Sequence, residues 1–122
     1  MLDIVVKHGS QIHLNSDTPS LNSVQSGGAA ANTAAWLTQV NVNSHFFGKV
    51  GEDIAGEKII ADLQSSGVKC HITRDSVKST GTVVVLVDTD GNRTMFPDPG
   101  ANAGLAGSIN VIANEFDGYF IS

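Results

Sequence analysis

The periodicity of apolar and polar residues changes along this chain, and its first part has the pattern of short strands. Residues 2–7 are rich in β-branched side chains and are expected to form a strand. Polar and apolar residues alternate over 10–14, which predicts a half-exposed strand. Residues 15–20, with Pro19 among them, have turn composition, and 21–25 is expected to be a further short strand. These strands would form a small antiparallel sheet with one weakly apolar face.

From residue 27 onward the pattern becomes that of helices. Glycines at 27–28 break the strand pattern, and the alanine-rich segment 29–40 has a high helix propensity. A second helix is expected between an N-cap at Asp53 and a C-cap at Gly67, because apolar residues between them recur one turn apart. Both helices are followed by strand-like segments, so helix and strand alternate here.

The remaining apolar runs predict strands at 44–50, 68–73, 82–88, 92–96 and 118–121. The run 82–88 is almost entirely β-branched, as in a strand buried on both faces, and Asp90-Gly91 predicts a hairpin turn after it. A loop over 97–107 and a helix over 109–114 are expected before the last strand. The alternation of helices and strands indicates an α/β fold with a mainly parallel sheet.

Composition narrows the class of protein. With 122 residues, 41% hydrophobic and 16% charged, the chain can build one core and is not intrinsically disordered. A net charge of -5 with scattered basic residues argues against a nucleic-acid partner. No apolar run reaches the roughly 20 residues of a membrane span, so no membrane partner is expected. The single cysteine, Cys70, cannot form an intrachain disulfide, and a reducing, cytoplasmic location is expected.

The most informative candidate site is the glycine pair Gly27-Gly28 with Asn32 behind it. Glycines let a ligand approach the backbone, and they lie at a helix start, where unpaired N–H groups gather. The Asn32 amide offers both a donor and an acceptor, which suits a hydroxyl-bearing ligand. The alternative is a tight turn before a helix, with Asn32 as a surface residue. Spacing alone leaves both interpretations open.

Further short motifs follow the glycine pair in a fixed order. They are Gly27-Gly28-x-x-x-Asn32-x-Ala34, the segment FGKVGEDIAG over 47–56, Gly67-Val68, Thr80-Gly81-Thr82, Asp90-Gly91-Asn92-Arg93 and Pro99-Gly100-Ala101-Asn102. In this order and spacing they resemble the signatures of the ribokinase (PfkB) family of carbohydrate kinases, over nearly the whole chain. Ala29 and Ala30 stand where many members of that family have lysine and glycine, which leaves the identity of the sugar open.

The resemblance implies a ribokinase-like doubly wound α/β sheet, truncated at both ends, with a small antiparallel β lid. Residues about 4–25 would be the lid, and 26–122 would be the α/β body without its C-terminal ATP-binding half. In the family such a lid covers the sugar and often pairs with the lid of a second subunit, so a homodimer is expected. Both ends of the chain run directly into apolar, strand-like residues, which we interpret as a domain cut from a longer one.

The resemblance also assigns substrate-binding residues, namely Asp3, Gly27, Gly28, Asn32 and Arg93. Asp3 falls on the acidic position of the family that binds sugar hydroxyls, although without the resemblance it reads as a solvated residue at a frayed terminus. Gly27 would shape the turn. Arg93 follows a hairpin and could reach a substrate hydroxyl, carboxylate or phosphate, or simply be solvated.

Other residues that could carry chemistry are expected to be structural. The acidic pair Glu52-Asp53 is interpreted as helix-start charge, Asn102 as a loop-shaping residue, and Trp36 as part of the core. The four histidines, His8, His13, His45 and His71, have no metal-ligand spacing with one another or with Cys70, so no metal site is expected.

The family's catalytic aspartate, in a G-A-G-D segment, does not occur in these residues. The parent enzyme would use ATP and Mg²⁺, but neither is expected to bind tightly to this chain, which alone would be inactive. Three hypotheses stay open. The chain is the N-terminal part of an ATP-dependent sugar kinase, a non-catalytic sugar- or nucleoside-binding module, or a decayed gene product with an aggregation-prone sheet edge.

Overall fold

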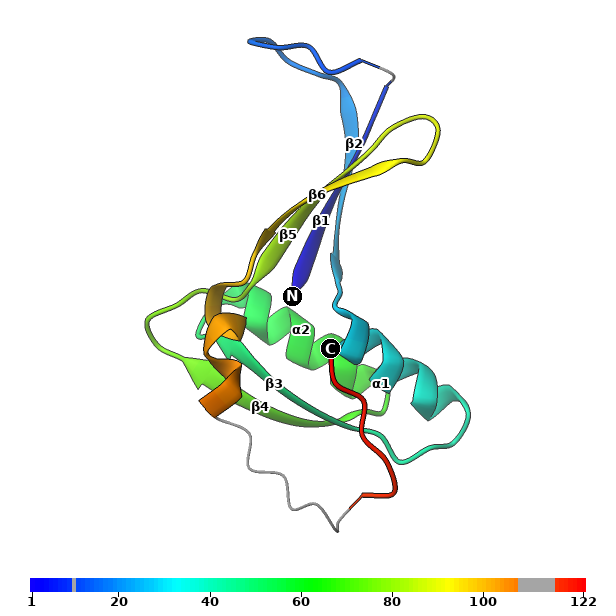
Figure 1. The fold of residues 1–122 in the computed structure, drawn as a ribbon, viewed down its shortest axis with the longest axis vertical. Coiled ribbons are helices and arrows are strands. Elements are labelled where there is room, and N and C mark those ends of the chain that lie inside the picture. The colour runs from blue at the N-terminus through cyan, green and yellow to red at the C-terminus, as the bar shows by residue number, and fades with distance from the viewer. Residues whose placement is uncertain (10, 108–115) are drawn as a thin grey trace.

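The computed structural model describes residues 1–9, 11–107 and 116–122, and its strands form two separate sheets (Figure 1). In chain order the elements are β1 (Leu2–His8), β2 (Ser20–Ser26), α1 (Ala29–Gln39), β3 (His45–Gly51), α2 (Ile54–Ser65), β4 (Lys69–Asp75), β5 (Thr82–Val87), β6 (Arg93–Asp98) and the 3₁₀ helix η1 (Gly100–Gly107). No helix among these described residues is long and apolar enough to cross a membrane.

The larger sheet has four strands in the order β2-β1-β5-β6 and rises away from the helices (Figure 1). Its central pair, β1 and β5, is parallel, and each outer strand is antiparallel to its neighbour. The predicted strands at 2–7 and 21–25 are therefore confirmed as β1 and β2. Two later strands, β5 and β6, join the same sheet, which local periodicity does not reveal.

The smaller sheet is the parallel pair β3-β4, which lies beside the two helices (Figure 1). Small residues on α1 and larger aliphatic residues on and after α2 form the main core cluster, which consists of Ala31, Ala34, Ile59, Leu63 and Val68. Because alanines form the buried face of α1, the helix lies close to its neighbours. Helix η1 packs against β3.

Both predicted ends of α2 are confirmed. The Asp53 carboxylate accepts a hydrogen bond from the Gly56 N–H at 2.8 Å, as an N-cap does. At the other end Gly67 has a φ of 83°, a backbone conformation that favours glycine. Its N–H donates to the Gln64 carbonyl and the Val68 N–H to the Leu63 carbonyl, which is the bond pattern of a Schellman motif.

Several expected strand features are wrong. Residues 11–14 form no strand, because the His13 N–H donates to Thr18 Oγ1 at 2.8 Å and the segment turns back on itself. Residues 118–121 form no strand either, since no described strand pairs with them. Strand β5 alternates between buried and half-buried positions and is not buried on both faces. The predicted helix at 109–114 lies outside the described residues.

Two further expectations need correction. Trp36 is 75% exposed and lies outside the core, because the buried face of α1 is formed by Ala31 and Ala34 instead. The four-stranded sheet is mixed, and among the described strand pairs β1-β5 and β3-β4 are parallel, whereas β1-β2 and β5-β6 are antiparallel. The antiparallel pairs are the ones that join strands close in sequence, where a short connection suffices.

Candidate functional site

Asp3 lies on the central strand β1, where it pairs with Gln25 of β2 and Val83 of β5. Its carboxylate packs directly on the backbone of Gly27. A Cβ atom placed on Gly27 would collide with all three atoms of the Asp3 carboxylate group, so a side chain there would displace the carboxylate. The first residue of the glycine pair is thus required by the presence of Asp3, and the two predicted site residues are in contact.

The second glycine starts helix α1. Gly28 has a φ of 105° and serves as the N-cap, and its carbonyl accepts the N–H of Asn32 at 3.0 Å. The preceding residue is tied to the start of β1, because the Gly27 N–H donates to the Met1 carbonyl at 3.0 Å. Asp3 and Gly28 therefore lie, half-buried, on either side of the buried Gly27 at the junction of β1 and α1.

The environment of the Asp3 carboxylate is unusual for a charged group. It is half-buried, and no described residue donates a hydrogen bond to it. Burial raises the pKa of Asp3, and the nearby Met1 ammonium partly offsets the rise. A partly desolvated carboxylate without protein donors keeps its acceptor capacity for a ligand.

Asn32 lies one turn into α1 with an exposed side chain, and no described residue hydrogen-bonds that side chain. The hydrogen bond from its backbone N–H to the Gly28 carbonyl holds the backbone from which the Asn32 side chain extends. The predicted amide is therefore available to a ligand at the same helix end as the glycine pair. The surface interpretation of Asn32 and the ligand-binding one both agree with this exposure.

Arg93 is not brought together with the other predicted residues. It begins β6, is exposed, and pairs with Val87, which in turn pairs with Lys7. Asp3 lies in a different row of the sheet, four residues along β1 from Lys7. The two rows share one face but are about 13 Å apart along the strands, given a rise of about 3.3 Å per residue.

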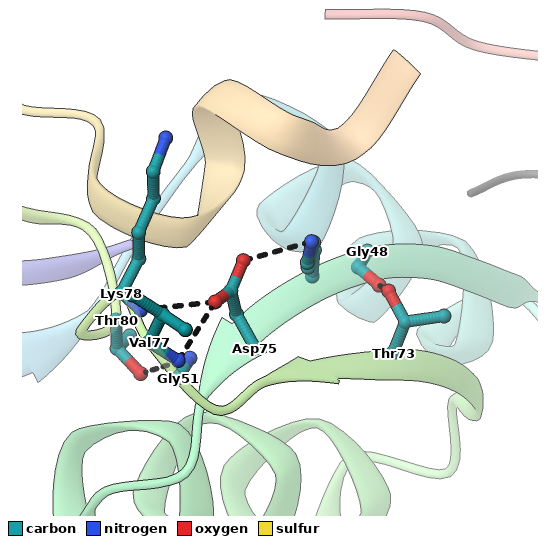
Figure 2. Close-up of polar contacts among 8 residues, drawn as sticks. Gly48, Gly51, Thr73, Asp75, Val77, Lys78 and Thr80 are labelled. Carbon is teal, nitrogen blue, oxygen red and sulfur yellow. Dashed lines mark hydrogen bonds and ion pairs between the residues drawn. The ribbon is translucent and has the colours of Figure 1, made fainter. Parts of the chain in front are cut away.

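A second polar cluster lies where β3, α2 and the segment before β5 meet. Asp53 Oδ1 accepts the Thr80 hydroxyl at 2.6 Å, and Asp53 Oδ2 accepts the Thr80 N–H at 2.8 Å. The buried Thr80 hydroxyl in turn accepts the Gly51 N–H at 2.9 Å (Figure 2). These bonds hold the pKa of Asp53 below its ordinary value, with the Thr80 hydroxyl as the main cause.

The motifs at 47–56, 80–82 and 99–102 therefore converge on this cluster. Ala101, which is fully buried, donates its N–H to the Ser79 carbonyl at 2.8 Å, and the Asn102 N–H donates to the Pro99 carbonyl at 2.9 Å. Residues in these motifs bond mainly to one another. The interpretation of Asp53 as a helix-start residue is confirmed, whereas the role of Thr80 could not be read from local sequence because its partners lie far away in the chain.

Lys49 and Asp75 form an ion pair in the same region, and the pKa of Asp75 is strongly shifted there. The Asp75 carboxylate accepts Lys49 Nζ at 2.8 Å and the N–H groups of Val77 and Lys78 at 3.0 Å and 2.9 Å (Figure 2). The Lys49 ammonium and these donors hold the pKa of Asp75 far below its usual range. Its bonding capacity is used to fix the end of β4, so it is a structural carboxylate.

The structure offers no metal centre in the ranges that it describes. No three histidine, cysteine, aspartate or glutamate side chains come together there. His45 Nδ1 and His71 Nε2 do approach to 2.9 Å across β3 and β4, which the sequence spacing did not indicate. Two nitrogens without a third ligand fall short of the coordination that a protein normally gives a metal ion.

Comparisons with known proteins agree with this geometry. The family model described as pfkB family carbohydrate kinase matches residues 6–114. An uncharacterized sugar kinase of Archaeoglobus fulgidus is 33% identical over 70 residues, which are 57% of this chain and 28% of that protein.

Solved structures match the fold as well. Ribokinase from Giardia lamblia superposes with a TM-score of 0.76 at 25% identity, over 85% of this chain and 32% of that one. Arabidopsis thaliana ribokinase complexed with ribose and ATP gives 0.72 at 27% identity, over 83% and 34%. The chain thus spans about a third or less of the length of the proteins that it matches.

Proposed function

The chain belongs to the pfkB family of carbohydrate kinases, and on this premise we propose that it is the N-terminal, sugar-binding part of an ATP-dependent kinase that phosphorylates a sugar hydroxyl. The observation that carries the proposal is the contact between the Asp3 carboxylate and the Gly27 backbone, at the start of α1. No described residue donates a hydrogen bond to this half-buried carboxylate, so its acceptor oxygens are open to the hydroxyls of a sugar.

Each residue of the proposed site has a separate role in holding the sugar. Asp3 accepts hydroxyl hydrogen bonds, which are strengthened by its charge. Gly27 makes room for the Asp3 carboxylate, and Gly28 keeps the backbone bare, so that the ring can approach the helix end. Asn32 offers a donor and an acceptor to a further hydroxyl. Arg93, at the far end of the same face, would meet only a substrate long enough to extend along the sheet.

The four-stranded sheet supports the proposal of a lid. Strands β1 and β2 form one half of it and overlap the proposed lid of residues 4–25, and a sheet placed over the sugar excludes water that would otherwise accept the phosphoryl group. The face that bears Asp3 also carries Val83 and Val85, whereas the opposite face carries Ile4, Val84 and Phe96. If the first face covers the sugar, the second is left for the lid of another copy in a homodimer.

Phosphoryl transfer itself needs groups that this chain does not supply in its described residues. ATP and Mg²⁺ would serve the whole enzyme, but no described cluster has the ligands for a metal ion. The catalytic base and the ATP pocket are proposed to come from the part of the matched proteins that this chain does not cover. The chain alone is then expected to be inactive, and a cytoplasmic setting suits such an enzyme.

A second candidate is a non-catalytic module that binds a sugar or nucleoside. Both candidates need the same sugar site, and they differ in phosphate transfer. A decayed gene product, the third possibility, would lack the site as well. Activity with ATP on adding the missing region in trans separates the first candidate from the second.

The sugar site is tested by thermal denaturation of the chain with D-ribose, D-fructose and adenosine. A ligand present at about 100 times its Kd stabilises the fold by about 2.7 kcal/mol, so the Tm should rise by several degrees with at least one of them. Glycerol at the same concentration controls for solvent effects that need no site. An unchanged Tm with every sugar and nucleoside would refute the proposed function.

A further inference from the structure

The first turn of α1 is capped in an unusual way. Its N-cap, Gly28, has no side chain and therefore makes no side-chain hydrogen bond to the helix. The Ala30 N–H instead donates to Ser122 Oγ at 3.2 Å, from a residue 92 positions later in the chain. One of the unpaired amides that every helix start carries is thus satisfied from the far end of the sequence.

Ser122 belongs to a segment, 116–122, that is also anchored at its other end. The Phe116 ring meets the edges of His45 and Phe47 on β3, with centroid distances of 4.9 Å and 5.9 Å. Between its two anchors the segment lines an apolar cavity of about 420 Å³ together with α1 and β3. The segment therefore bridges β3 and the beginning of α1.

We infer that Ser122 is a positioning residue for the proposed sugar site, whose hydroxyl fixes the first turn of α1 and with it Gly28 and Asn32. The inference rests on the proposed function, because it assigns a task at the same site. A glycine N-cap offers no side-chain acceptor to the amides of the first turn, where helices fray, and Asn32 is bonded to Gly28 within that turn. A hydroxyl acceptor at Ala30 limits this fraying before any ligand binds.

The bond also explains why no local capping residue is needed. A serine or aspartate in place of Gly28 would cap the helix, but its φ of 105° is one that a side chain rarely adopts. Position 28 therefore cannot meet both needs. The sugar requires a backbone without a side chain there, whereas a local cap for the helix that holds Asn32 requires one. A cap supplied by Ser122 resolves that conflict.

Two substitutions and a control test the inference on the full chain. In Ser122→Ala the hydroxyl is lost, and in Ser122→Thr it is kept. Ser16→Ala removes an exposed hydroxyl in the loop between β1 and β2, where it has no described partner. Amide hydrogen exchange at Ala30 reports the cap, and titration with D-ribose and D-fructose reports the site.

We expect Ser122→Ala to speed exchange at Ala30 and to raise the sugar Kd by about 3- to 10-fold, the factor expected for one hydrogen bond. The Tm should fall by no more than a few degrees, because only one hydrogen bond is lost. Ser122→Thr and Ser16→Ala should behave as the unsubstituted chain. Unchanged exchange, or an unchanged Kd in Ser122→Ala, overturns the inference.

Failure of the proposed function gives a different pattern. If the unsubstituted chain binds neither these two sugars nor adenosine, the proposed function fails, and the amide exchange alone then decides the role of Ser122. Faster exchange confined to the first turn of α1 in Ser122→Ala still supports positioning of that turn. Equal exchange in both chains overturns it.

Discussion

At the scale of single residues, the surroundings of Asp3 oppose its charge while leaving the carboxylate open to a ligand. Burial raises its pKa, so ionisation is less favourable in the folded chain than in the unfolded one. Stability from this group is therefore present at low pH and falls as the pH rises through the range in which Asp3 ionises. The residue proposed to bind the sugar thus has a small cost for folding.

The substitution Asp3→Asn tests whether the Asp3 charge lowers the stability of the fold while it strengthens sugar binding. At pH 7 it should leave the Tm equal or slightly higher, because an unfavourable charge is removed, and the gain should vanish at low pH where Asp3 is protonated. It should also weaken sugar binding by about tenfold or more, since hydrogen bonds to charged groups contribute about 1.5–3 kcal/mol. Thermal denaturation at several pH values and sugar titration measure the two effects.

Asp17→Asn is the matched control, because Asp17 is exposed in the loop before β2. It should change neither the Tm nor the sugar affinity. A lower Tm in Asp3→Asn at pH 7 would show that the carboxylate stabilises the fold, which contradicts its proposed role as a carboxylate held for a ligand.

Single residues with a local signal were predictable from sequence. Asp53 and Gly67 were identified as helix ends, because capping depends on neighbours within a few positions. The exposure of Trp36 and the bonds of Thr80 were missed, because both depend on elements that meet only in the folded chain. The family resemblance assigned Asp3 and Gly27 to one site, whereas their direct contact was not predicted.

At the scale of elements, Thr80 ties α2 and β3 to the segment that leads into β5. Its hydroxyl donates to Asp53 and accepts from Gly51, so one side chain satisfies a helix cap and a strand end. Thr80→Val keeps the shape but leaves the Gly51 N–H without its partner. We expect a loss of about 2 kcal/mol in the free energy of unfolding at pH 7.

The pH dependence of this loss follows from Asp53. Its pKa is lowered in the folded state, so its stabilising effect is present above the unfolded pKa of about 4 and is lost as the pH falls through the folded pKa. The difference between Thr80→Val and the unsubstituted chain should therefore shrink in acid. Urea denaturation at pH 7 and pH 3 measures it. Thr80→Ser, which keeps the hydroxyl, should lose much less, and an equal loss would contradict the hydrogen-bond explanation.

Helix α2 was predicted because periodicity and caps agreed, α1 because an alanine-rich segment follows the glycine pair, and β3 because of its apolar composition. Predictions failed for strands whose formation or position depends on pairing with a distant segment. Residues 118–121 have the composition of a strand, but a strand needs a neighbour, and none is present among the described residues. The placement of β5 and β6 beside β1 likewise depends on long-range pairing, which no local pattern encodes.

At the scale of the whole molecule, the four-stranded sheet has apolar side chains on both faces. Neighbouring residues of β6 point to opposite sides, so Phe96 lies on the face away from Asp3 and Met95 on the face that carries it. The two side chains are similarly exposed, at 57% and 55%. They form a matched pair for testing which face binds a second copy.

We expect Phe96→Glu to disrupt the proposed homodimer, because a charge would be buried in an apolar interface. Met95→Glu should leave the dimer intact, since its face is assigned to the sugar. Sedimentation equilibrium of both variants measures the change. A dimer that survives Phe96→Glu but dissociates in Met95→Glu would reverse the assignment of the faces.

The central claim is that Asp3, the glycine pair and Asn32 bind one sugar. Titration of the isotopically labelled chain with D-ribose, D-fructose and adenosine, followed by amide chemical shifts in NMR, tests it most directly. The account predicts saturable shifts, with at least one of these ligands, that are largest at Asp3, Gly27, Gly28 and Asn32 and small at Arg93. Saturable shifts located elsewhere, with these four amides unmoved, would contradict it.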